Sequence, residues 1–491
     1  MAQRIYRNER EVANLHGVPI YMNDVVDACL AGKLNIFIQG DTGSGKTQLA
    51  ADAMSSFGAG TGDGRMASAV AEQYKDRLDA KGLVAVTAAQ KMPEDKTLFV
   101  LGRNDMDTRE LFQRFNLHRV GFKPHYDLEP LVDPETGNVR WYYPKVDDKG
   151  VFAYSEIPAD KAAMVRSRLE TLAGSTENIR ELTSKINTNL IVVDELPNCV
   201  PAVRAQLFNL FDGFVELNGK HYAIGSNGYS VGIATGNIGQ QFTESSNDLG
   251  RAIKDRMHVI IDADHFFPKP SDTLEILAGN TDPRVDFGAS GSNEEDKVIE
   301  RYKALSAKPV PLSKLIVANY LLHGLDYCKA GNDVQSKRQM KNTWPNAVDS
   351  HGQGSDESLV LPLSTRAAKS VIRLSQALDD FTVERGVPRA DVEKSALNSM
   401  MQAYRLVAPH SGVLNEAKVQ GVYNGDHYKA INAVITTTIT EFNNNKDNLK
   451  AGLEMVRSGK TNKKITDLFK GRWGFMKDTL DRLMVHREGA E

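Results

Sequence analysis

The sequence predicts an α/β fold, in which a parallel sheet is flanked by helices and followed by a helical C-terminal part. Three observations support this prediction. A short apolar run from Leu34 to Ile38 leads into a glycine-rich turn and then into a stretch of helical character, Gln48 to Met54. Further apolar runs of strand length recur along the chain, and some end in polar residues. From residue 294 onward, apolar residues recur mainly at helical spacing.

Composition limits the class of protein. The chain has 491 residues, enough for about two to four domains with large cores. Its formal net charge is −3, whereas nucleic-acid-binding proteins typically carry an excess of basic residues. Cys29, Cys199 and Cys328 are far apart and form no C-x-x-C pair, so we expect reduced, buried thiols. There is no apolar export signal and no apolar run long enough for a membrane span. We therefore expect a cytoplasmic protein.

The glycine-rich turn matches the G-x-x-x-x-G-K-[ST] phosphate-binding loop and lies between a strand and a helix, as that motif requires. Its residues are Gly40, Asp41, Thr42, Gly43, Ser44, Gly45, Lys46 and Thr47. Glycines let backbone N–H groups curl around a polyphosphate, and the helix N-terminus adds partial positive charge. We expect Lys46 to reach the β- and γ-phosphates of ATP, and the Thr47 hydroxyl to bind Mg²⁺. The alternative is a turn that binds nothing, and the flanking strand and helix argue against it.

A second motif consists of the four apolar residues from Leu190 to Val193, followed by Asp194 and Glu195. This pattern is typical of a buried parallel strand that ends at the ligand-binding edge of an α/β sheet. Asp194 would hold Mg²⁺ through water, and Glu195 would polarise the attacking water. Apolar strands also end in acids for no functional reason. The upstream phosphate-binding loop nevertheless favours a Walker B site here.

The other elements can be predicted in chain order. We expect strands at 97–101, 139–143, 229–237 and 258–262, and a hairpin at 215–222. We expect helices at 24–32, 108–115, 159–185, 200–214, 294–306, 312–329, 365–383 and 389–406. Asn237, at the end of a predicted strand, would hydrogen-bond the γ-phosphate or the attacking water, although a plain turn residue is the alternative. Three lone histidines have no metal-ligand spacing and are expected to be structural: His118, His258 and His265.

Four segments, taken in order, resemble AAA+ ATPases: G-D-T-G-S-G-K-T, L-I-V-V-D-E-L-P-N, I-A-T-G-N and L-G-R-A-I-K-D-R-M. They most resemble the MoxR branch with its dynein-related and magnesium-chelatase-like relatives. By position, the resemblance implies that Asn237 is the sensor 1 residue. It also implies that Arg256 is the arginine finger that reaches a neighbouring subunit's γ-phosphate, with Arg251 as the second candidate. Arg366, in L-P-L-S-T-R-A-A, resembles the sensor 2 arginine of the lid.

The resemblance covers residues 12 to about 410 and implies a domain organisation. It predicts a P-loop NTPase αβα sandwich (AAA+ core) at 1–264, an α-helical lid at 265–410 and a helical C-terminal extension at 411–491. Such a lid closes over the nucleotide by a hinge motion. The chain departs from the family by being longer in three places, where we expect insertions at about 55–95, 116–188 and 329–358.

The resemblance predicts a Mg²⁺-dependent ATPase whose subunits form a homo-oligomeric ring, a hexamer in this family. It implies remodelling, activation or cofactor insertion on a client protein, with a von Willebrand A-domain protein as a frequent partner. A DNA-associated replication or packaging motor is the alternative, because residues 446–477 carry more Lys and Arg than acid, with interleaved aromatics. We favour a helix that docks Phe469, Trp473 and Phe475 on the body. A scaffold that does not hydrolyse ATP is a third hypothesis, and the Asp194–Glu195 pair argues against it.

Overall fold

The computed structural model describes residues 5–57, 96–103, 106–115, 129–132, 139–146, 152–157, 180–217, 220–237, 254–279, 284–285, 294–330, 333–340, 342–346, 348, 355–459 and 461–488. The chain divides into two compact units. The first unit comprises Met1–Ala2, Met54–Gly232 and Ala289–Glu294. The second unit comprises Gln3–Ala53, Ile233–Gly288 and Glu295–Glu491.

A five-stranded parallel sheet has the hydrogen-bonded order β14-β3-β13-β10-β4. Its strands are β3 (Ile36–Gln39), β4 (Thr97–Leu101), β10 (Leu190–Asp194), β13 (Val231–Gly236) and β14 (Val259–Asp262). All residues of β3, β10 and β13 are buried, because strands covered on both faces need apolar side chains on both. The sheet, its flanking helices and the helical C-terminal part fit an α/β P-loop AAA+ core with a helical extension. The predicted fold class is therefore confirmed.

In the described part of the first unit, two α-helices, two 3-10 helices and several antiparallel strands accompany β4 and β10. They are α5 (Thr108–Phe112), β5 (Gln113–Phe115), β6 (Glu129–Val132), β7 (Val139–Val146), β8 (Phe152–Ile157), β9 (Arg180–Leu182), η2 (Ser184–Asn187), η3 (Leu196–Asn198), α8 (Pro201–Phe211), β11 (Phe214–Leu217) and β12 (Lys220–Ala223). The β11–β12 pairing confirms the predicted hairpin. The predicted helix at 108–115 is too long, because β5 pairs with β9. Most of the helix predicted at 159–185 lies outside the described residues.

The N-terminal part of the second unit contains a small hairpin and the first helices. They are β1 (Ala13–Leu15), β2 (Val18–Ile20), α1 (Met22–Gly32), the first residues of α2 (Lys46–Phe57) and α10 (Pro270–Gly279). Helix α1 is capped at its C-terminal end by Lys33, which adopts the left-handed conformation with φ 53°. A glycine is the usual residue in this conformation, but Gly32 is still part of the helix. Gly32 is small for another reason, since a Cβ there would lie 3.2 Å from Leu34.

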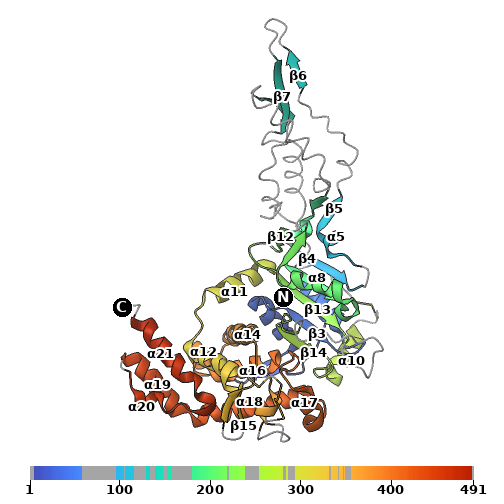
Figure 1. Cartoon of the computed structure of the whole chain (residues 1–491). Coiled ribbons are helices and arrows are strands. Elements are labelled where there is room, and N and C mark those ends of the chain that lie inside the picture. Colours follow the sequence, from blue (N-terminus) through green and yellow to red (C-terminus); the bar gives the residue numbers. More distant parts are fainter. Residues whose placement is uncertain are drawn as a thin grey trace. The chain divides into compact units, whose positions relative to one another are not determined.

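The helical part of the second unit begins at residue 295. Its first elements are α11 (Glu295–Ala307), α12 (Leu312–Asn319), η4 (Tyr320–Gly324), β15 (Tyr327–Ala330), β16 (Asp333–Ser336), α13 (Asp356–Leu359), α14 (Thr365–Glu384), α15 (Arg389–Lys394) and α16 (Ala396–Val407). The helix predicted at 312–329 is wrong beyond Gly324, because the following residues pair as the β15–β16 hairpin. The helix predicted at 389–406 is broken at Ser395. Helix α14 packs against both α1 and α16 (Figure 1).

The C-terminal helices of the second unit are α17 (Glu416–Tyr423), α18 (His427–Asn444), α19 (Lys446–Ser458), α20 (Lys463–Thr466), η5 (Gly471–Trp473) and α21 (Phe475–Glu488). Helices α19, α20 and α21 pack on one another (Figure 1). Phe469 is 0% exposed and Trp473 is 3% exposed. The side chains of both residues are therefore docked in the interior, which confirms the interpretation favoured from the sequence for these two aromatics.

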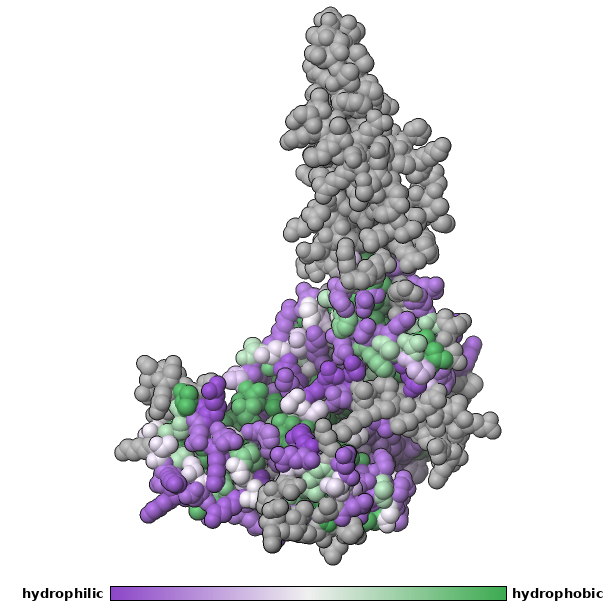
Figure 2. Space-filling view, viewed as in Figure 1, coloured by the Kyte–Doolittle hydropathy of each residue, from purple (hydrophilic) through white to green (hydrophobic). Residues whose placement is uncertain are grey.

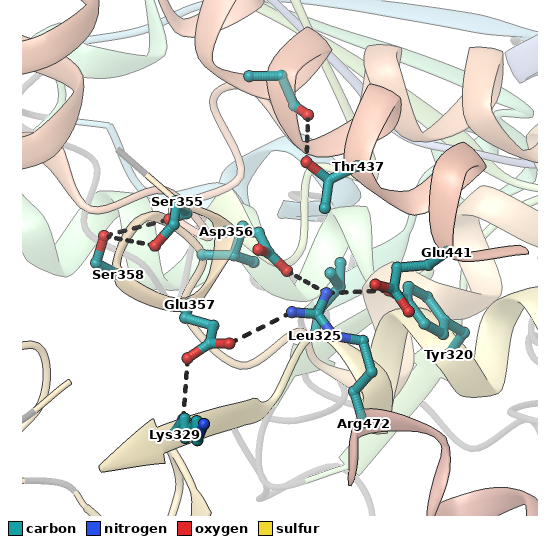
Figure 3. A network of polar contacts seen from close by, with 12 residues as sticks. Tyr320, Leu325, Lys329, Ser355, Asp356, Glu357, Ser358, Thr437, Glu441 and Arg472 are labelled. Atoms are coloured by element: carbon teal, nitrogen blue, oxygen red, sulfur yellow. Dashed lines mark hydrogen bonds and ion pairs between the residues drawn. The ribbon is translucent and has the colours of Figure 1, made fainter. Parts of the chain in front are cut away.

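Arg472 attaches the last helices to the rest of the second unit (Figure 3). Its Nη1 lies 2.7 Å from Oδ2 of Asp356, and its Nη2 lies 3.4 Å from Oε1 of Glu357. Nη1 also donates to the Tyr320 hydroxyl at 3.2 Å. Burial alone would lower the pKa of Arg472, but the Asp356 charge and the Tyr320 contact more than offset burial and raise it. The guanidinium therefore stays charged in this buried position.

Hydrophilic residues predominate on the part of the described surface seen in Figure 2, with smaller apolar patches between them. None of the helices in the described ranges has the length and apolar character needed to cross a membrane. All three cysteines are free and buried.

Candidate functional site

The phosphate-binding loop joins the buried end of β3 to the first residue of α2, Lys46. Gly43 and Gly45 have φ angles of 83° and 82°, which side chains with a Cβ rarely adopt. At Gly40, a Cβ would lie 2.9 Å from the Ser44 hydroxyl. The sequence therefore needs glycine at all three positions to make a turn this tight. The turn places the N-terminus of a 12-residue helix directly after the loop.

Asp41 is the centre of the hydrogen bonds inside this loop. Its carbonyl oxygen accepts one hydrogen bond from Nζ of Lys46, at 2.6 Å, and another from the Ser44 hydroxyl, at 2.8 Å. Its Oδ1 accepts the N–H of Thr42 at 2.7 Å. These bonds hold the Lys46 ammonium across the loop, beside the backbone N–H groups that would surround a polyphosphate. Thr47 follows Lys46 in the first turn of α2, which is the position expected for a hydroxyl ligand of Mg²⁺.

Asn237 lies close to the same loop. It follows β13 directly, and its Nδ2 is 3.5 Å from the Thr42 hydroxyl. The contact arises because β13 and β3 are parallel neighbours, so their carboxyl ends meet at one edge of the sheet. The structure thus brings together the predicted sensor 1 residue and the predicted phosphate-binding loop.

In the first unit, the candidate Walker B residues end strand β10. Asp194 is the last strand residue and is 9% exposed, whereas Glu195 is exposed. Glu195 has φ 57° and ψ 41°, a left-handed conformation that costs a non-glycine residue about 1 kcal/mol or more. Such strain is often retained where a side chain must point in a particular direction. The turn therefore aims the Glu195 carboxylate away from the buried strand.

Two further residues shape this turn, and sequence reasoning assigned neither of them. Nδ2 of Asn198 donates to Oε2 of Glu195 at 2.6 Å. The N–H of Gly102 donates to the carbonyl of Asp194 at 2.7 Å, and a Cβ on Gly102 would lie 2.7 Å from the carbonyl oxygen of Glu195. An asparagine three residues after a Walker B glutamate is a visible sequence signal. The role of Gly102 depends on β4 lying beside β10, so it has no local signal.

Arg256 lies away from the phosphate-binding loop of its own chain. Its carbonyl accepts Nδ2 of Asn35 at 3.4 Å, and Asn35 directly precedes β3, whereas the loop follows β3. The four residues of β3 span about 13 Å. The structure therefore places the backbone of Arg256 at the opposite edge of the sheet from the loop. Arg251, the second finger candidate, lies outside the described residues.

Arg366 is found in the same region of the second unit as Arg256. Its Nη1 lies 3.8 Å from Oδ2 of Asp255, the residue before Arg256. Ser364 caps α14 by accepting the N–H of Ala367, and its hydroxyl donates to Asp255 through a short hydrogen bond. Helix α14 is thereby attached beside the candidate finger. The predicted sensor 2 arginine pairs here with a carboxylate of its own chain.

Several titratable groups surround the end of β14, on the loop side of the sheet. Asp264 is an exposed residue, but partial burial of its carboxyl against the loop raises its pKa, a shift that the N–H of Asp41 opposes and the charge of Asp262 reinforces. Burial lowers the pKa of His410, whose Nε2 lies 3.5 Å from Asp262. His265 stacks on a tyrosine of α18, with ring centroids 4.0 Å apart. These contacts give the histidines structural partners.

Each unit contains one candidate side chain whose oxygen is of a kind that can bind Mg²⁺ together with a nucleotide. Within the described ranges, no group of three or more His, Cys, Asp or Glu side chains could hold a metal ion by itself. Mg²⁺ is usually bound through one or two carboxylates or hydroxyls together with substrate phosphates and waters. Thr47, at the start of α2, and Asp194, at the end of β10, are donors of this kind.

No protein-family model matches the sequence, and no curated protein matches it either. Among solved structures, the chain is similar to the crystal structure of a protein from Cytophaga hutchinsonii that is named as a proposed ATPase. The two chains share 15% sequence identity with a TM-score of 0.43, over 84% of this chain and 87% of the other. The assignment of a function therefore depends on the geometry of the site.

Proposed function

We propose that this protein binds and hydrolyses ATP with Mg²⁺. The observation that carries the proposal is the conformation of residues 40–47, in which three glycines have positive φ and the Lys46 ammonium lies across the loop. This conformation directs positive charge toward the inside of the loop, from the backbone N–H groups, the N-terminus of α2 and the Lys46 ammonium. That combination suits a polyphosphate. Mg²⁺, when bound through Thr47 and Asp194, would neutralise charge on the phosphate oxygens.

The other residues of the site have roles that follow from their chemistry. Glu195 would orient and polarise the attacking water, and Asn198 fixes the direction of its carboxylate. Asn237 is close enough to Thr42 to serve the terminal phosphate or that water. In such phosphoryl transfers the protein mostly supplies position and charge, with little covalent chemistry of its own.

We further propose that the active form is a ring, a hexamer as the AAA+ resemblance implies. The placement of Arg256 supports this, because its backbone lies a strand length from its own loop. An arginine there is better placed for the nucleotide of another copy. Loss of an arginine supplied in trans costs about 10³-fold or more in turnover. The core, lid and extension boundaries predicted at 264 and 410 belong to the same proposal.

We propose remodelling or activation of a client protein as the work coupled to hydrolysis, on the strength of the MoxR resemblance. A von Willebrand A-domain protein is the expected kind of partner. The β11–β12 hairpin is a feature that could contact a client or the pore of the ring. The lid helix α14, attached beside Arg256 through Ser364 and Asp255, could pass movement of the lid to the subunit interface.

The alternative, a DNA-associated motor, draws on exposed basic residues in the C-terminal helices, among them Lys463, Lys464 and Lys470. Binding of single strands usually adds aromatic side chains on which bases stack. Phe469 and Trp473 are buried and do not offer such a platform. Contacts to the phosphate backbone alone would remain, and they would be strongly salt-dependent.

The test combines steady-state ATPase activity with mass by light scattering, with and without single-stranded and duplex DNA. We expect Lys46→Ala to weaken nucleotide binding strongly, while leaving a dissociation constant that calorimetry can still measure at high protein concentration. Glu195→Gln should keep binding, because its amide oxygen can still accept from Asn198, and should lose about 10²- to 10⁴-fold in kcat. Normal turnover by Glu195→Gln would refute the Walker B assignment. A rate that rises many-fold with DNA and collapses in moderate salt would replace client remodelling with the DNA motor.

The ring is tested with Arg256→Ala, and Arg457→Ala serves as a control because its side chain is 77% exposed on α19. We expect the Arg256 variant to assemble normally and to lose about 10³-fold in turnover. The control should match the wild type. An assembled Arg256→Ala ring with normal turnover would exclude this residue as the finger.

A further inference from the structure

Asp264 is a carboxylate against the phosphate-binding loop that the proposed reaction does not use. It follows β14 by two residues, and its Oδ2 accepts the backbone N–H of Asp41 at 2.8 Å. Its Oδ1 lies 3.0 Å from the position that a Cβ on Gly40 would occupy. Asp264 therefore contacts the first two residues of the loop. It is not part of the G-x-x-x-x-G-K-[ST] motif.

The turn that presents Asp264 is itself held by hydrogen bonds. Oδ1 of Asp262 accepts the N–H of Asp264 and the N–H of His265, each at 3.0 Å. The N–H of Ala263 donates to the carbonyl of Gln39 at 2.8 Å. This bond continues the β14–β3 pairing as far as the residue before the loop. Asp264 thus extends from a defined turn at the end of a buried strand.

The residue that Asp264 holds is also the one that orients the loop lysine. The carbonyl of Asp41 accepts Nζ of Lys46 at 2.6 Å. The N–H and the carbonyl of Asp41 belong to the two planar peptide groups on either side of its Cα. The bond from Asp264 fixes the first of these groups, so the carbonyl can turn away only by rotation about the two dihedrals of Asp41. The bond from Lys46 to that carbonyl restrains the second group, and the two contacts together hold Asp41 in place.

We propose that Asp264 is a positioning residue for nucleotide binding, which holds Asp41 so that its carbonyl keeps the Lys46 ammonium aimed at the phosphates. This inference rests on the proposed ATP site. The negative charge of Asp264 works against phosphate binding. Asp264 is an exposed residue, so water and salt weaken that repulsion, and the hydrogen bond to Asp41 dominates.

The test measures the dissociation constant of the non-hydrolysable ATP analogue AMP-PNP with Mg²⁺ by calorimetry. We expect Asp264→Ala to weaken binding about tenfold, the size expected for losing a hydrogen bond to a charged group. Asp264→Asn keeps an acceptor for the Asp41 N–H and removes the charge, so its affinity should equal or exceed that of the wild type. In steady-state turnover, Asp264→Ala should raise KM about tenfold and change kcat less than about threefold.

A double-mutant cycle separates action through Lys46 from a general structural effect. In a Lys46→Ala background, Asp264→Ala should weaken binding by less than about twofold, because no ammonium remains to be aimed. Thermal unfolding checks that the variants are folded, and Asp264→Ser provides a second variant too short to reach Asp41.

Equal losses in both backgrounds, or an Asp264→Ala protein that binds as tightly as the wild type or more tightly, would overturn the inference. Wild-type protein that binds no nucleotide would refute the ATP site as well. Normal wild-type binding with an unaffected Asp264→Ala would refute only this inference.

Discussion

Replacing Asn198 by alanine tests how the candidate catalytic carboxylate is held. The variant removes the amide that donates to Oε2 of Glu195 at 2.6 Å. It keeps the backbone bond from the N–H of residue 198 to the carbonyl of Glu195, which is 3.0 Å long. The turn after β10 can therefore still form. What changes is the direction of a side chain that extends from a left-handed residue.

The size of the effect follows from the exposure of the two groups. A hydrogen bond to a charged group is worth about 1.5 to 3 kcal/mol in a protein interior. Both side chains are exposed here, so about 1 kcal/mol is appropriate, which corresponds to roughly fivefold in the population of aimed carboxylate. If only the aimed form activates water, kcat falls about fivefold. KM should be unchanged because residues 40–47 are not altered.

The assay is steady-state ATP turnover at saturating nucleotide, with Asn198→Asp as the companion variant. Asn198→Asp removes the donor and adds a second negative charge beside Glu195, so its kcat should be lower than that of Asn198→Ala. A wild-type kcat in Asn198→Ala would show that the bond does not aim the base. A higher kcat would show that Asn198 restrains Glu195, which is the reverse of the role inferred here.

Three further predictions concern stability. Gly102→Ala places a Cβ 2.7 Å from the carbonyl oxygen of Glu195, so we expect about 1 to 3 kcal/mol of destabilisation and a lower Tm. Arg472→Ala leaves the buried Asp356 carboxylate without its 2.7 Å partner and should cost about 3 kcal/mol in denaturant unfolding. The hydrogen bond from His427 lowers the pKa of Glu416. Burial lowers the pKa of His427, but the hydrogen bond and charge of Glu416, together with smaller contributions, outweigh burial and raise it. Glu416→Gln should therefore lower Tm at pH 6 more than at pH 8.5.

The sign of the pH effect follows from the two shifts. A raised histidine pKa stabilises the fold fully below the ordinary value of 6.5, and the effect is lost as pH rises through the raised pKa. A lowered glutamate pKa stabilises the fold above the ordinary value of 4.5, and the effect is lost as pH falls through the lowered pKa. The pair therefore contributes most between about pH 4.5 and 6.5.

Specific outcomes would contradict these three predictions. A pH-independent loss in Glu416→Gln would mean that packing, and not charge, explains its stability. An Arg472→Ala protein as stable as the wild type would mean that the buried Asp356 carboxylate does not need its 2.7 Å partner. An unchanged Tm in Gly102→Ala would mean that the turn after β10 can move aside at little cost.

The parts of this fold that were predicted from sequence are those with a local cause. The buried strands could be found because both of their faces are covered and their residues are almost all apolar, as in Leu190 to Val193. The phosphate-binding loop could be found because its glycines, Lys46 and Thr47 must follow one another in the chain. In both cases the physical requirement acts within about ten residues, so the sequence displays it directly.

The parts that were missed depend on partners far away in the chain. Residues 113–115 have helical spacing but form a strand because they pair with residues 180–182. Asp264 lies more than 200 residues from Asp41, and no local pattern marks it. A single sequence without tertiary contacts contains no signal for such pairs.

The two ends of β14 lie next to residues with different proposed roles, one in nucleotide binding and one in hydrolysis. The end near Asp264 contacts the phosphate-binding loop of the same chain. The beginning of the strand follows Arg256, at the opposite edge of the sheet. In the proposed ring, Asp264 would act on the nucleotide of its own subunit, whereas Arg256 would act on hydrolysis by a neighbour. We therefore expect binding and turnover to depend on residues that flank opposite ends of β14 (Val259–Asp262).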